Sequence, residues 1–303
     1  MKIVILDGGS ISSTDLSWDC LDEFADVTFY ETTSDEDVVK HIGDADGIFT
    51  SKKKINESIL SQCPELKFVG VLATGYDNIN LEDCKARNVS VYYTPAYSTE
   101  AVAQHTISLI LEIKNRIYEN CKLSEEGHWF NKPGYNYYWA PISLLDGMSL
   151  GIIGYGNIGK RVASIAKALG MKINIYSRDK ESCIKSDIIS LHCPATDDNY
   201  HMINEDFISQ MKDGAVIINT ARGKLIDEAA LIKALESGKI SAAGLDVLEN
   251  EPPENNPLIG MKNCFVTPHV AWSPKETRQK VIDAAYDNLK AFLNNEETIR
   301  KLV

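Results

Sequence analysis

The chain has 303 residues, of which 44% are hydrophobic and 24% are charged, a composition typical of one large or two ordinary globular domains. Its formal net charge of −12 opposes binding to nucleic acid or to an anionic membrane, because either partner requires a basic surface. No apolar run reaches the ~18 residues of a membrane span, and the opening "MKIVILDGGS" is too short in apolar residues for a signal peptide.

The cysteines indicate a reducing compartment. There are seven, an odd number, and none shows the Cys-x-x-Cys spacing of a redox or zinc motif. Thiols scattered in this way are typical of a reduced interior rather than of a disulfide framework. We therefore predict a cytoplasmic protein with no metal site.

The first part of the chain alternates short apolar runs with helical patterns. We predict strands at residues 2–7, 27–31, 47–50, 68–73 and 89–94. Amphipathic stretches at 55–63 and 81–88 lie between some of them. This βα alternation favours a parallel sheet covered on both faces.

A long helix is predicted next, over residues 99–120, "TEAVAQHTISLILEIKNRIYEN". The aromatic segment that follows, "HWFNKPGYNYYWAP" at 128–141, fits neither a helical nor a strand period.

The alternation resumes at Leu150. The six predicted strands of this part are 150–156, 173–176, 187–192, 215–220, 241–247 and 264–269. Six strands at this spacing suit a doubly wound sheet, so the chain is predicted to hold two α/β domains. A last amphipathic helix, 273–295, could pack on either domain.

The first chemical motif is a glycine-rich turn, Gly154, Gly156 and Gly159 in the pattern GxGxxG. The turn follows an apolar run and precedes a helical stretch with apolar residues at Val162, Ile165, Ala166 and Leu169. In this context the glycines let the backbone approach a pyrophosphate, and the helix start offers unpaired N–H groups. A tight turn without a ligand is the weaker interpretation.

Further polar residues follow later strands, namely Arg222, Asp246, Glu251 and His269. In doubly wound sheets, ligands collect at the carboxyl ends of the strands. Arg can bind a carboxylate through two hydrogen bonds, and Glu can hold a His that exchanges protons with a carbonyl or hydroxyl. Each residue alone could be an ordinary surface or strand-end residue, but the series downstream of a dinucleotide turn favours a site.

With these motifs in place, the sequence resembles the D-isomer-specific 2-hydroxyacid dehydrogenase family over nearly its whole length. The resemblance lies in "LATGYDNIN", "LGIIGYGNIGK", "SDIISLHCPAT", "VIINTARGKLIDEAAL", "GLDVLENEPP" and "FVTPHVAW". Within the family, "AVAQHT", "WAPISLLDGMSLGIIGYGNIGK" and "TPHVAWSPKETR" are most similar to the glycerate dehydrogenase, or hydroxypyruvate reductase, branch.

The resemblance implies a discontinuous architecture. Residues 1–97 and 273–303 would form a smaller, flavodoxin-like substrate domain, and residues 98–272 a Rossmann domain for the dinucleotide. The active site would lie in the cleft between them. The aromatic stretch from Trp129 to Trp139 falls where the family forms much of its homodimer interface, although these aromatics could instead fill a core.

The resemblance also implies roles for the catalytic and substrate-binding residues. His269 would be the acid/base, and Glu251 its partner, since a carboxylate bonded to imidazole favours the charged ring. Arg222 would bind the substrate carboxylate and polarise the reacting carbonyl. The backbone of Ala73, Thr74 and Gly75 would bind the same carboxylate. Lys52 or Lys53 would line the substrate side, unless Lys52 to Lys54 are only a solvated charge run.

On the cofactor side, the resemblance implies contacts along the whole dinucleotide. Besides Gly154 and Gly156, the matching positions are Val102, Asn157, Ile158, His192, Cys193, Pro194, Thr220, Ala221, Asp246, His269 and Ala271. Val102 would pack on the nicotinamide, and Asp246 would hold its carboxamide. Cys193 could be a redox thiol, but its apolar neighbourhood favours simple packing.

The chain departs from the family pattern at residues 177 and 178. Where an acid usually holds the adenine ribose, the chain has Ser177 followed by Arg178. A hydroxyl and a guanidinium would accommodate the extra phosphate of NADP, so NADP is favoured modestly over NAD. Alternatively, Arg178 could be only a solvent-exposed charge.

A second departure concerns length. Only seven residues separate Arg178 from the "SDIISLHCP" motif, where the family usually has a further strand and a helical turn. The wall beside the adenine is therefore expected to be reduced.

The resemblance implies an NAD(P)H-dependent reductase of a small 2-keto acid, hydroxypyruvate or glyoxylate, that yields the D-2-hydroxy acid. A reductase of a bulkier 2-keto acid and a nucleotide-sensing corepressor-like protein are the alternatives. The partners expected are a small anionic acid and a second copy of the chain.

Overall fold

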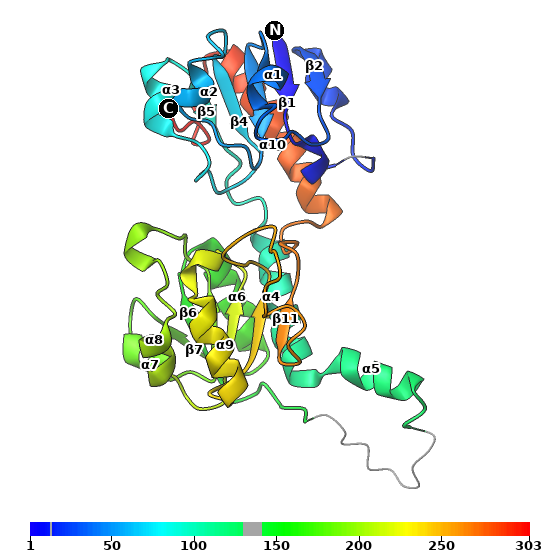
Figure 1. Cartoon of the computed structure of the whole chain (residues 1–303), viewed down its shortest axis with the longest axis vertical. Helices are drawn as coiled ribbons and strands as arrows, with labels where there is room; N and C mark the ends of the chain where they lie inside the picture. The colour runs from blue at the N-terminus through cyan, green and yellow to red at the C-terminus, as the bar shows by residue number, and fades with distance from the viewer. Residues whose placement is uncertain (13, 130–140) are drawn as a thin grey trace. The chain divides into compact units, whose positions relative to one another are not determined.

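The computed structural model describes residues 1–12, 14–129 and 141–303 and divides into two compact units. One, here called the discontinuous unit, consists of Met1–Ser98 and Ser273–Val303. The other, the continuous unit, is Thr99–Trp272. Figure 1 colours the chain by residue number, so that the blue and red ends of the sequence fall in the first unit.

The discontinuous unit is built on a parallel sheet of five strands in the order β2-β1-β3-β4-β5. The strands are β1 (Lys2–Ile5), β2 (Asp26–Phe29), β3 (Gly47–Thr50), β4 (Phe68–Val71) and β5 (Ser90–Tyr92). The helices are η1 (Gly8–Ser10), η2 (Asp19–Glu23), α1 (Val38–Ile42), α2 (Glu57–Leu60), α3 (Leu81–Ala86) and α10 (Lys275–Leu293). The order is the flavodoxin-like one, with its switch point between β1 and β3.

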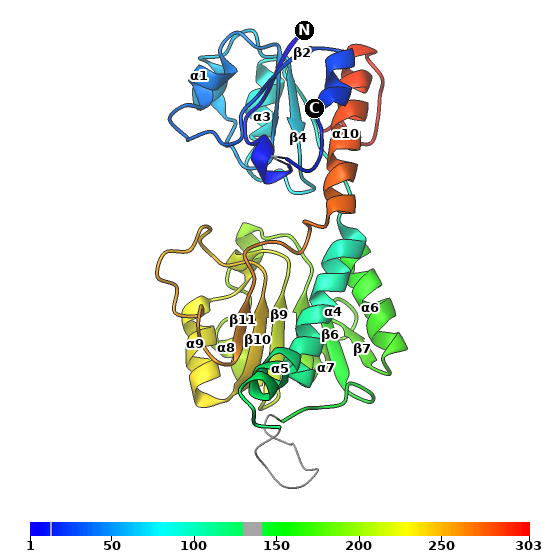
Figure 2. The same ribbon diagram turned by 90° about the vertical axis from the view of Figure 1, so that its right-hand side faces the viewer.

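The two faces of this sheet are covered by segments from opposite ends of the sequence. Helices α1 to α3 pack on one face around Ile48 and Val69. Helix α10 packs on the other (Figure 2), and the ring centroid of its Phe292 lies 5.1 Å from that of Phe68. Because strand side chains alternate between faces, each face buries its own apolar set.

The last residues of the chain extend the same sheet. Lys301 forms an antiparallel bridge with Tyr92, and Val91 exchanges backbone hydrogen bonds with Leu302 and Val303. These bonds satisfy backbone groups of β5 that an edge strand would leave open.

The continuous unit is built on a parallel sheet of six strands in the order β11-β10-β9-β8-β6-β7. The strands are β6 (Ser149–Ile153), β7 (Lys172–Ile175), β8 (Ile188–Leu191), β9 (Ala215–Asn219), β10 (Ile240–Leu245) and β11 (Cys264–Val266). The helices are α4 (Thr99–Asn115), α5 (Ile117–Glu125), α6 (Asn157–Ala168), α7 (Lys180–Ile184), η3 (Asp197–Asn199), α8 (Glu205–Gln210), η4 (Gly223–Leu225) and α9 (Glu228–Ser237).

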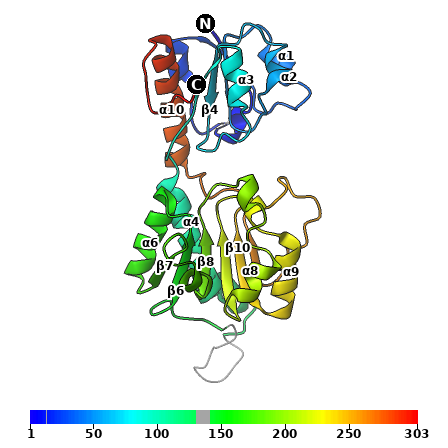
Figure 3. The same ribbon diagram turned by 90° about the vertical axis from the view of Figure 1, so that its left-hand side faces the viewer.

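This sheet is also covered on both faces. Helices α4 and α6 pack on one face around Ile152 and Val216, and α7 to α9 pack on the other around Ile189 and Ile217 (Figure 3). The predicted fold class, two doubly wound α/β sheets, is confirmed, and each predicted strand has its counterpart.

Side-chain caps fix where several of the short helices begin. The side-chain oxygen of Asn80 accepts hydrogen bonds from backbone N–H groups of α3, and Asp179 and Asp227 do the same for α7 and α9. Each such cap is worth about 1 kcal/mol, which matters for helices of five or six residues.

The prediction of one long helix over 99–120 is wrong in one respect, because this segment forms two helices. Arg116 adopts a left-handed conformation with φ of 50°, which ends α4 at Asn115 and starts α5 in a new direction. Its guanidinium lies over the ring of Phe265, 5.8 Å from the centroid. The periodicity of the sequence continues through this break, so it gave no sign of it.

The structure also tests the apolar helix face predicted after the glycine turn and part of the aromatic stretch. Of the apolar face predicted after the glycine turn, Val162 and Ala166 are buried, but Leu169 is 37% exposed because α6 ends before it. Of the aromatic stretch, Trp129 is described and 56% exposed, whereas Trp139 lies outside the described residues. None of the described helices combines the length and the apolar character that crossing a bilayer requires.

Candidate active site

The residues predicted to form the site in the continuous unit follow its six strands. Because all the strands run parallel, their carboxyl ends share one edge of the sheet. The segments at this edge are Gly154–Ile158 after β6, Ser177–Arg178 after β7, His192–Pro194 after β8, Thr220–Arg222 after β9, Asp246 after β10 and His269–Ala271 after β11.

The glycine turn lies at the switch point of this sheet. β6 has β7 on one side and β8 on the other, so the chain leaves it in both directions. Gly154 has φ of +96°, and a Cβ there would lie 2.4 Å from the backbone carbon of His192. A Cβ on Gly156 would meet nothing within 4 Å. The turn is thus closed toward β8 and open beside Gly156, at the N-terminus of α6, where Asn157 and Ile158 begin the helix.

The turn after β7 places Arg178 against this glycine turn. Its guanidinium carbon lies 5.2 Å from the centroid of the Tyr155 ring, within the range of a cation–π contact. Ser177 and Arg178 are both exposed. β7 is the edge strand of the sheet, and α7 alone leads from this turn to β8, which agrees with the shortened segment.

The loop after β8 holds a neutral histidine. Nε2 of His192 lies 2.9 Å from Oγ of Ser190, and burial lowers the pKa of His192 to about 3. Burial also raises the pKa of the Cys193 thiol, which makes it a poor nucleophile. Pro194, the next residue, is exposed.

The turn after β9 is tied to helix α4. Oγ1 of Thr220 lies 2.8 Å from Oγ1 of Thr106, whose hydroxyl also lies 2.8 Å from the carbonyl oxygen of Val102. The turn itself is closed by Asn219, whose side chain bonds the N–H of Ala221 and the carbonyl of Arg222. Arg222 is half-buried, and its Nη1 donates to the carbonyl of Ala221.

Glu251 and His269 form a close ion pair. Nδ1 of His269 lies 2.6 Å from Oε2 of Glu251, and both side chains are about one-third exposed, 35% and 32%. The second carboxylate oxygen, Oε1, accepts the backbone N–H of Leu248 at 3.0 Å. With Nδ1 engaged, Nε2 is the other ring nitrogen that can donate or accept a proton.

Asp246 holds the loop on which His269 lies. Its side chain is 1% exposed, and its two oxygens accept the backbone N–H groups of Val270 and Ala271, each at 2.9 Å. The hydroxyl of Thr267 donates to the same carboxylate at 2.6 Å.

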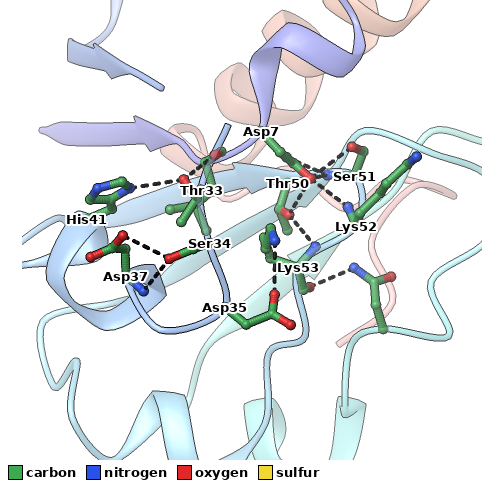
Figure 4. A network of polar contacts seen from close by, with 12 residues as sticks. Asp7, Thr33, Ser34, Asp35, Asp37, His41, Thr50, Ser51, Lys52 and Lys53 are labelled. Atoms are coloured by element: carbon green, nitrogen blue, oxygen red, sulfur yellow. Dashed lines mark hydrogen bonds and ion pairs between the residues drawn. The ribbon is translucent and has the colours of Figure 1, made fainter. Parts of the chain in front are cut away.

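In the discontinuous unit, a buried carboxylate holds the loop that contains Lys52. Asp7 accepts hydrogen bonds from the backbone N–H groups of Ser51 and Lys52 and from the hydroxyls of Thr50 and Ser51 (Figure 4). The Lys52 side chain is exposed and points away from this network. Lys53, the alternative candidate, instead pairs with Asp35 at 2.9 Å.

The segment of Ala73, Thr74 and Gly75 follows β4 in the same unit. The Thr74 hydroxyl donates to the carbonyl of Thr94, and the Thr94 N–H donates to the carbonyl of Ala73. Within the described residues, the backbone N–H groups of Ala73, Thr74 and Gly75 donate no hydrogen bond to the protein. They are therefore available to an anion.

Several residues that support the site were not predicted. They are Asp7, Thr106 and Thr267, which bond predicted residues, and His105, which bonds Thr267. Thr267 lies two residues before His269, and His105 and Thr106 lie in the motif "AVAQHT", so the sequence marked these segments without indicating the roles of the residues. Asp7 had no such signal.

Comparisons with known proteins identify what the chain is similar to. The family model described as "D-isomer specific 2-hydroxyacid dehydrogenase, NAD binding domain" matches residues 107–271. A hydroxypyruvate reductase of Blautia hydrogenotrophica is 41% identical, with 97% of each chain covered. A glycerate dehydrogenase of Methylorubrum extorquens is 35% identical, with 96% of each chain covered. The solved structure of an acyclic imino acid reductase in complex with NADPH and D-Arg is 28% identical, with a TM-score of 0.86 over all of both chains.

Proposed function

The chain belongs to the D-isomer specific 2-hydroxyacid dehydrogenase family of oxidoreductases, and we propose that it reduces a small 2-keto acid to the D-2-hydroxy acid with NAD(P)H. Hydroxypyruvate and glyoxylate are the proposed substrates, by analogy with relatives named hydroxypyruvate reductase and glyoxylate reductase. The observation that carries the proposal is the Glu251–His269 pair at the strand edge that also holds Arg222 and the glycine turn.

His269 is the proposed acid. Glu251 holds Nδ1 and stabilises the imidazolium, so that Nε2–H is the proton that passes to the ketone oxygen as it becomes a hydroxyl. In the reverse direction, neutral Nε2 accepts the hydroxyl proton. Because Glu251 is itself held by the N–H of Leu248, the ring has one preferred orientation.

Arg222 is the proposed anchor of the substrate. A guanidinium can bind a carboxylate through two parallel hydrogen bonds and can also stabilise the negative charge that develops on the ketone oxygen. In the discontinuous unit, the N–H groups of Ala73 to Gly75, which donate no hydrogen bond within the described residues, and the exposed ammonium of Lys52 are proposed to bind a substrate carboxylate.

The residues at the glycine turn fit a dinucleotide. The open space at Gly156 admits a pyrophosphate, while the N-terminus of α6 offers N–H groups to it. Asn157, Ile158 and the loop of His192 to Pro194 are proposed to line the adenosine half. Val102, Thr220, Ala221, Asp246 and Ala271 are proposed to line the nicotinamide half. A bound reduced nicotinamide supplies hydride to the carbonyl carbon.

NADP is the cofactor we propose from the turn after β7. Position 177 at the end of β7 is a serine rather than an acid, and the exposed Arg178 places its guanidinium over the Tyr155 ring of the glycine turn. A guanidinium in this place would pair with a 2′-phosphate, which an aspartate would repel.

A second copy of the chain is the partner we propose. Helix α5 has no buried residue, and Ile117, Tyr118 and Trp129 are 55%, 73% and 56% exposed. An apolar surface of this kind is typical of an interface. Light scattering should give twice the chain mass, and the double variant Ile117→Lys/Tyr118→Lys should give the mass of one chain.

The seven free thiols support the expected reducing, cytoplasmic compartment.

The proposal is tested by assaying purified protein with a panel of 2-keto acids and both reduced nucleotides. Oxidation of NADPH with hydroxypyruvate or glyoxylate is expected, and His269→Ala should lower turnover by about 10²- to 10⁴-fold with nucleotide binding retained. The matched control is His41→Ala, a histidine of the discontinuous unit, which should keep turnover.

Two other results would redirect the assignment. Preference for a branched or aromatic keto acid would make the chain a reductase of bulkier substrates. Nucleotide binding without turnover of any 2-keto acid would indicate a sensor.

A further inference from the structure

The loop that carries His269 has a strained backbone that the surrounding structure must hold. His269 has φ of 54°, in the left-handed region that residues other than glycine seldom adopt. Its N–H bonds the backbone carbonyls of Asp246 and Thr267, both at 2.9 Å. The next two N–H groups, of Val270 and Ala271, bond the Asp246 carboxylate. The orientation of that carboxylate therefore determines how the loop presents His269.

Proton counting shows what orients the carboxylate. The Thr267 hydroxyl lies 2.6 Å from Oδ1 of Asp246 and 3.0 Å from Nε2 of His105. A hydroxyl has one proton, and a carboxylate only accepts. Thr267 therefore donates to Asp246, and His105 must donate its Nε2–H to Thr267. The three groups form a directed chain, His105 to Thr267 to Asp246.

His105 joins this chain from a different element. It lies on helix α4, 162 residues before Thr267 in the sequence, and its side chain is 23% exposed. Its Nε2 is also 3.5 Å from Oδ1 of Asp246. Asp246 is 1% exposed at its side chain, so the imidazole is the basic group that faces this buried carboxylate in the described residues. Buried carboxylates require such partners.

We propose that His105 is a positioning residue for the reaction, acting through Thr267 and Asp246 on the backbone that carries His269. By fixing the carboxylate, it holds His269 in the strained conformation in which Nδ1 meets Glu251. The inference rests on the proposed function, in which His269 transfers the proton. No contact of His105 with substrate is involved.

The test compares variants that interrupt the hydrogen bonds from His105 to Thr267 to Asp246 with variants that keep the hydrogen-bond donors. Thr267→Val and His105→Leu should lower kcat by about 10- to 100-fold, because small displacements of a reacting group have effects of this size. Because Asp246 and Ala271 are also proposed to line the nicotinamide half, the KM for the nucleotide should change less than kcat. Thr267→Ser and His105→Gln, which keep a hydroxyl or an N–H donor, should recover most of kcat. Thr277→Val, a buried threonine of the discontinuous unit, is the matched control.

The double variant His105→Leu/Thr267→Val shows whether the two residues act through one hydrogen-bonded series or independently of each other. If the residues act in series, the double variant should be no slower than the slower single variant. Multiplying losses, or wild-type kcat in Thr267→Val, would overturn the proposal.

A second readout does not depend on turnover. In wild-type protein, nitrogen NMR of the histidine rings should show His269 with its proton on Nδ1, directed at Glu251, and Thr267→Val should give a mixture of tautomers. Hydrogen exchange at residues 267–271 should be faster in the same variant. If wild-type protein turns over no 2-keto acid, the proposed function fails, and the same two measurements on His105→Leu decide the role of His105. Unchanged spectra and exchange would refute it.

Discussion

Nδ1 of His269 lies 2.6 Å from Oε2 of Glu251, although 18 residues separate the two in the sequence. Glu251 cannot turn away freely, because its other oxygen accepts the N–H of Leu248. The pair therefore combines a negative charge with a fixed orientation, and the two contributions can be tested separately.

Glu251→Gln keeps an oxygen that can accept a hydrogen bond but removes the charge. The protonated ring of His269 then loses its partner charge, so kcat/KM for reduction should fall across the pH range. Steady-state rates for reduction between pH 5.5 and 9 provide the measurement. Glu249→Gln is the matched control, because Glu249 pairs with a different histidine, His201, at 2.8 Å. Equal profiles for wild type and Glu251→Gln would rule out the charge effect.

Ser177→Asp tests the choice of cofactor. A carboxylate at the end of β7 would repel a 2′-phosphate and could bond a ribose hydroxyl, so the ratio of kcat/KM for NADPH to that for NADH should fall by at least about tenfold. Arg178→Ala should lower the same ratio. Lys180→Ala, a nearby lysine that lies over the Tyr176 ring, is the control. A wild type that already prefers NADH strongly would contradict the NADP assignment.

Replacing two glycines of the same turn by alanine should have different effects, one on stability and one on nucleotide binding. A Cβ at Gly159 would lie 2.1 Å from the carbonyl oxygen of Gly154, so Gly159→Ala should destabilise the continuous unit by about 1–3 kcal/mol. Gly156→Ala meets no protein atom within 4 Å and should leave stability unchanged while weakening nucleotide binding. Urea unfolding and nucleotide titration of both variants separate the effects. Normal nucleotide binding by Gly156→Ala would place the pyrophosphate elsewhere.

His192 should make stability depend on pH. Burial lowers its pKa to about 3, against about 6.5 when unfolded, so between these values the unfolded chain binds one more proton. The stability that the neutral ring contributes is complete above pH 6.5 and is lost as the pH falls toward 3. Between pH 7 and 5.5 the loss should be about 1 kcal/mol, and His192→Gln should lack it. Urea unfolding at each pH provides the measurement. If the free energy of unfolding changed equally with pH in wild type and in His192→Gln, this account would be contradicted.

Much of the fold could be predicted because apolar runs of four to six residues alternate regularly with helical patterns. Each of the eleven strands in the described residues overlaps a predicted run, and β2, β6, β7 and β10 begin one residue before theirs. The break at Arg116 could not be predicted, because it depends on a left-handed residue whose guanidinium lies over Phe265, 149 positions away. Local pattern contains no information on such a contact.

The candidate site divides in the same way. Arg222, Glu251 and His269 were recognisable because each follows a strand and parallel strands share an edge. The supporting groups were not, because His105, which bonds Thr267, and Asp7, which holds the loop of Lys52, act through hydrogen bonds that form only once distant segments meet. A histidine within a helix and an aspartate after a strand have many ordinary explanations.

The discontinuous unit has a consequence for how the chain folds during synthesis. Its first 98 residues leave a sheet face that α10 covers and an edge that residues 301–303 extend, and both of these segments are synthesised after the continuous unit. The continuous unit, by contrast, is complete once Trp272 has emerged. Because domains generally fold as units, the middle of the nascent chain should fold before its beginning. The N-terminal segment would then expose an apolar sheet face until α10 is synthesised, and chaperones could bind this face during translation.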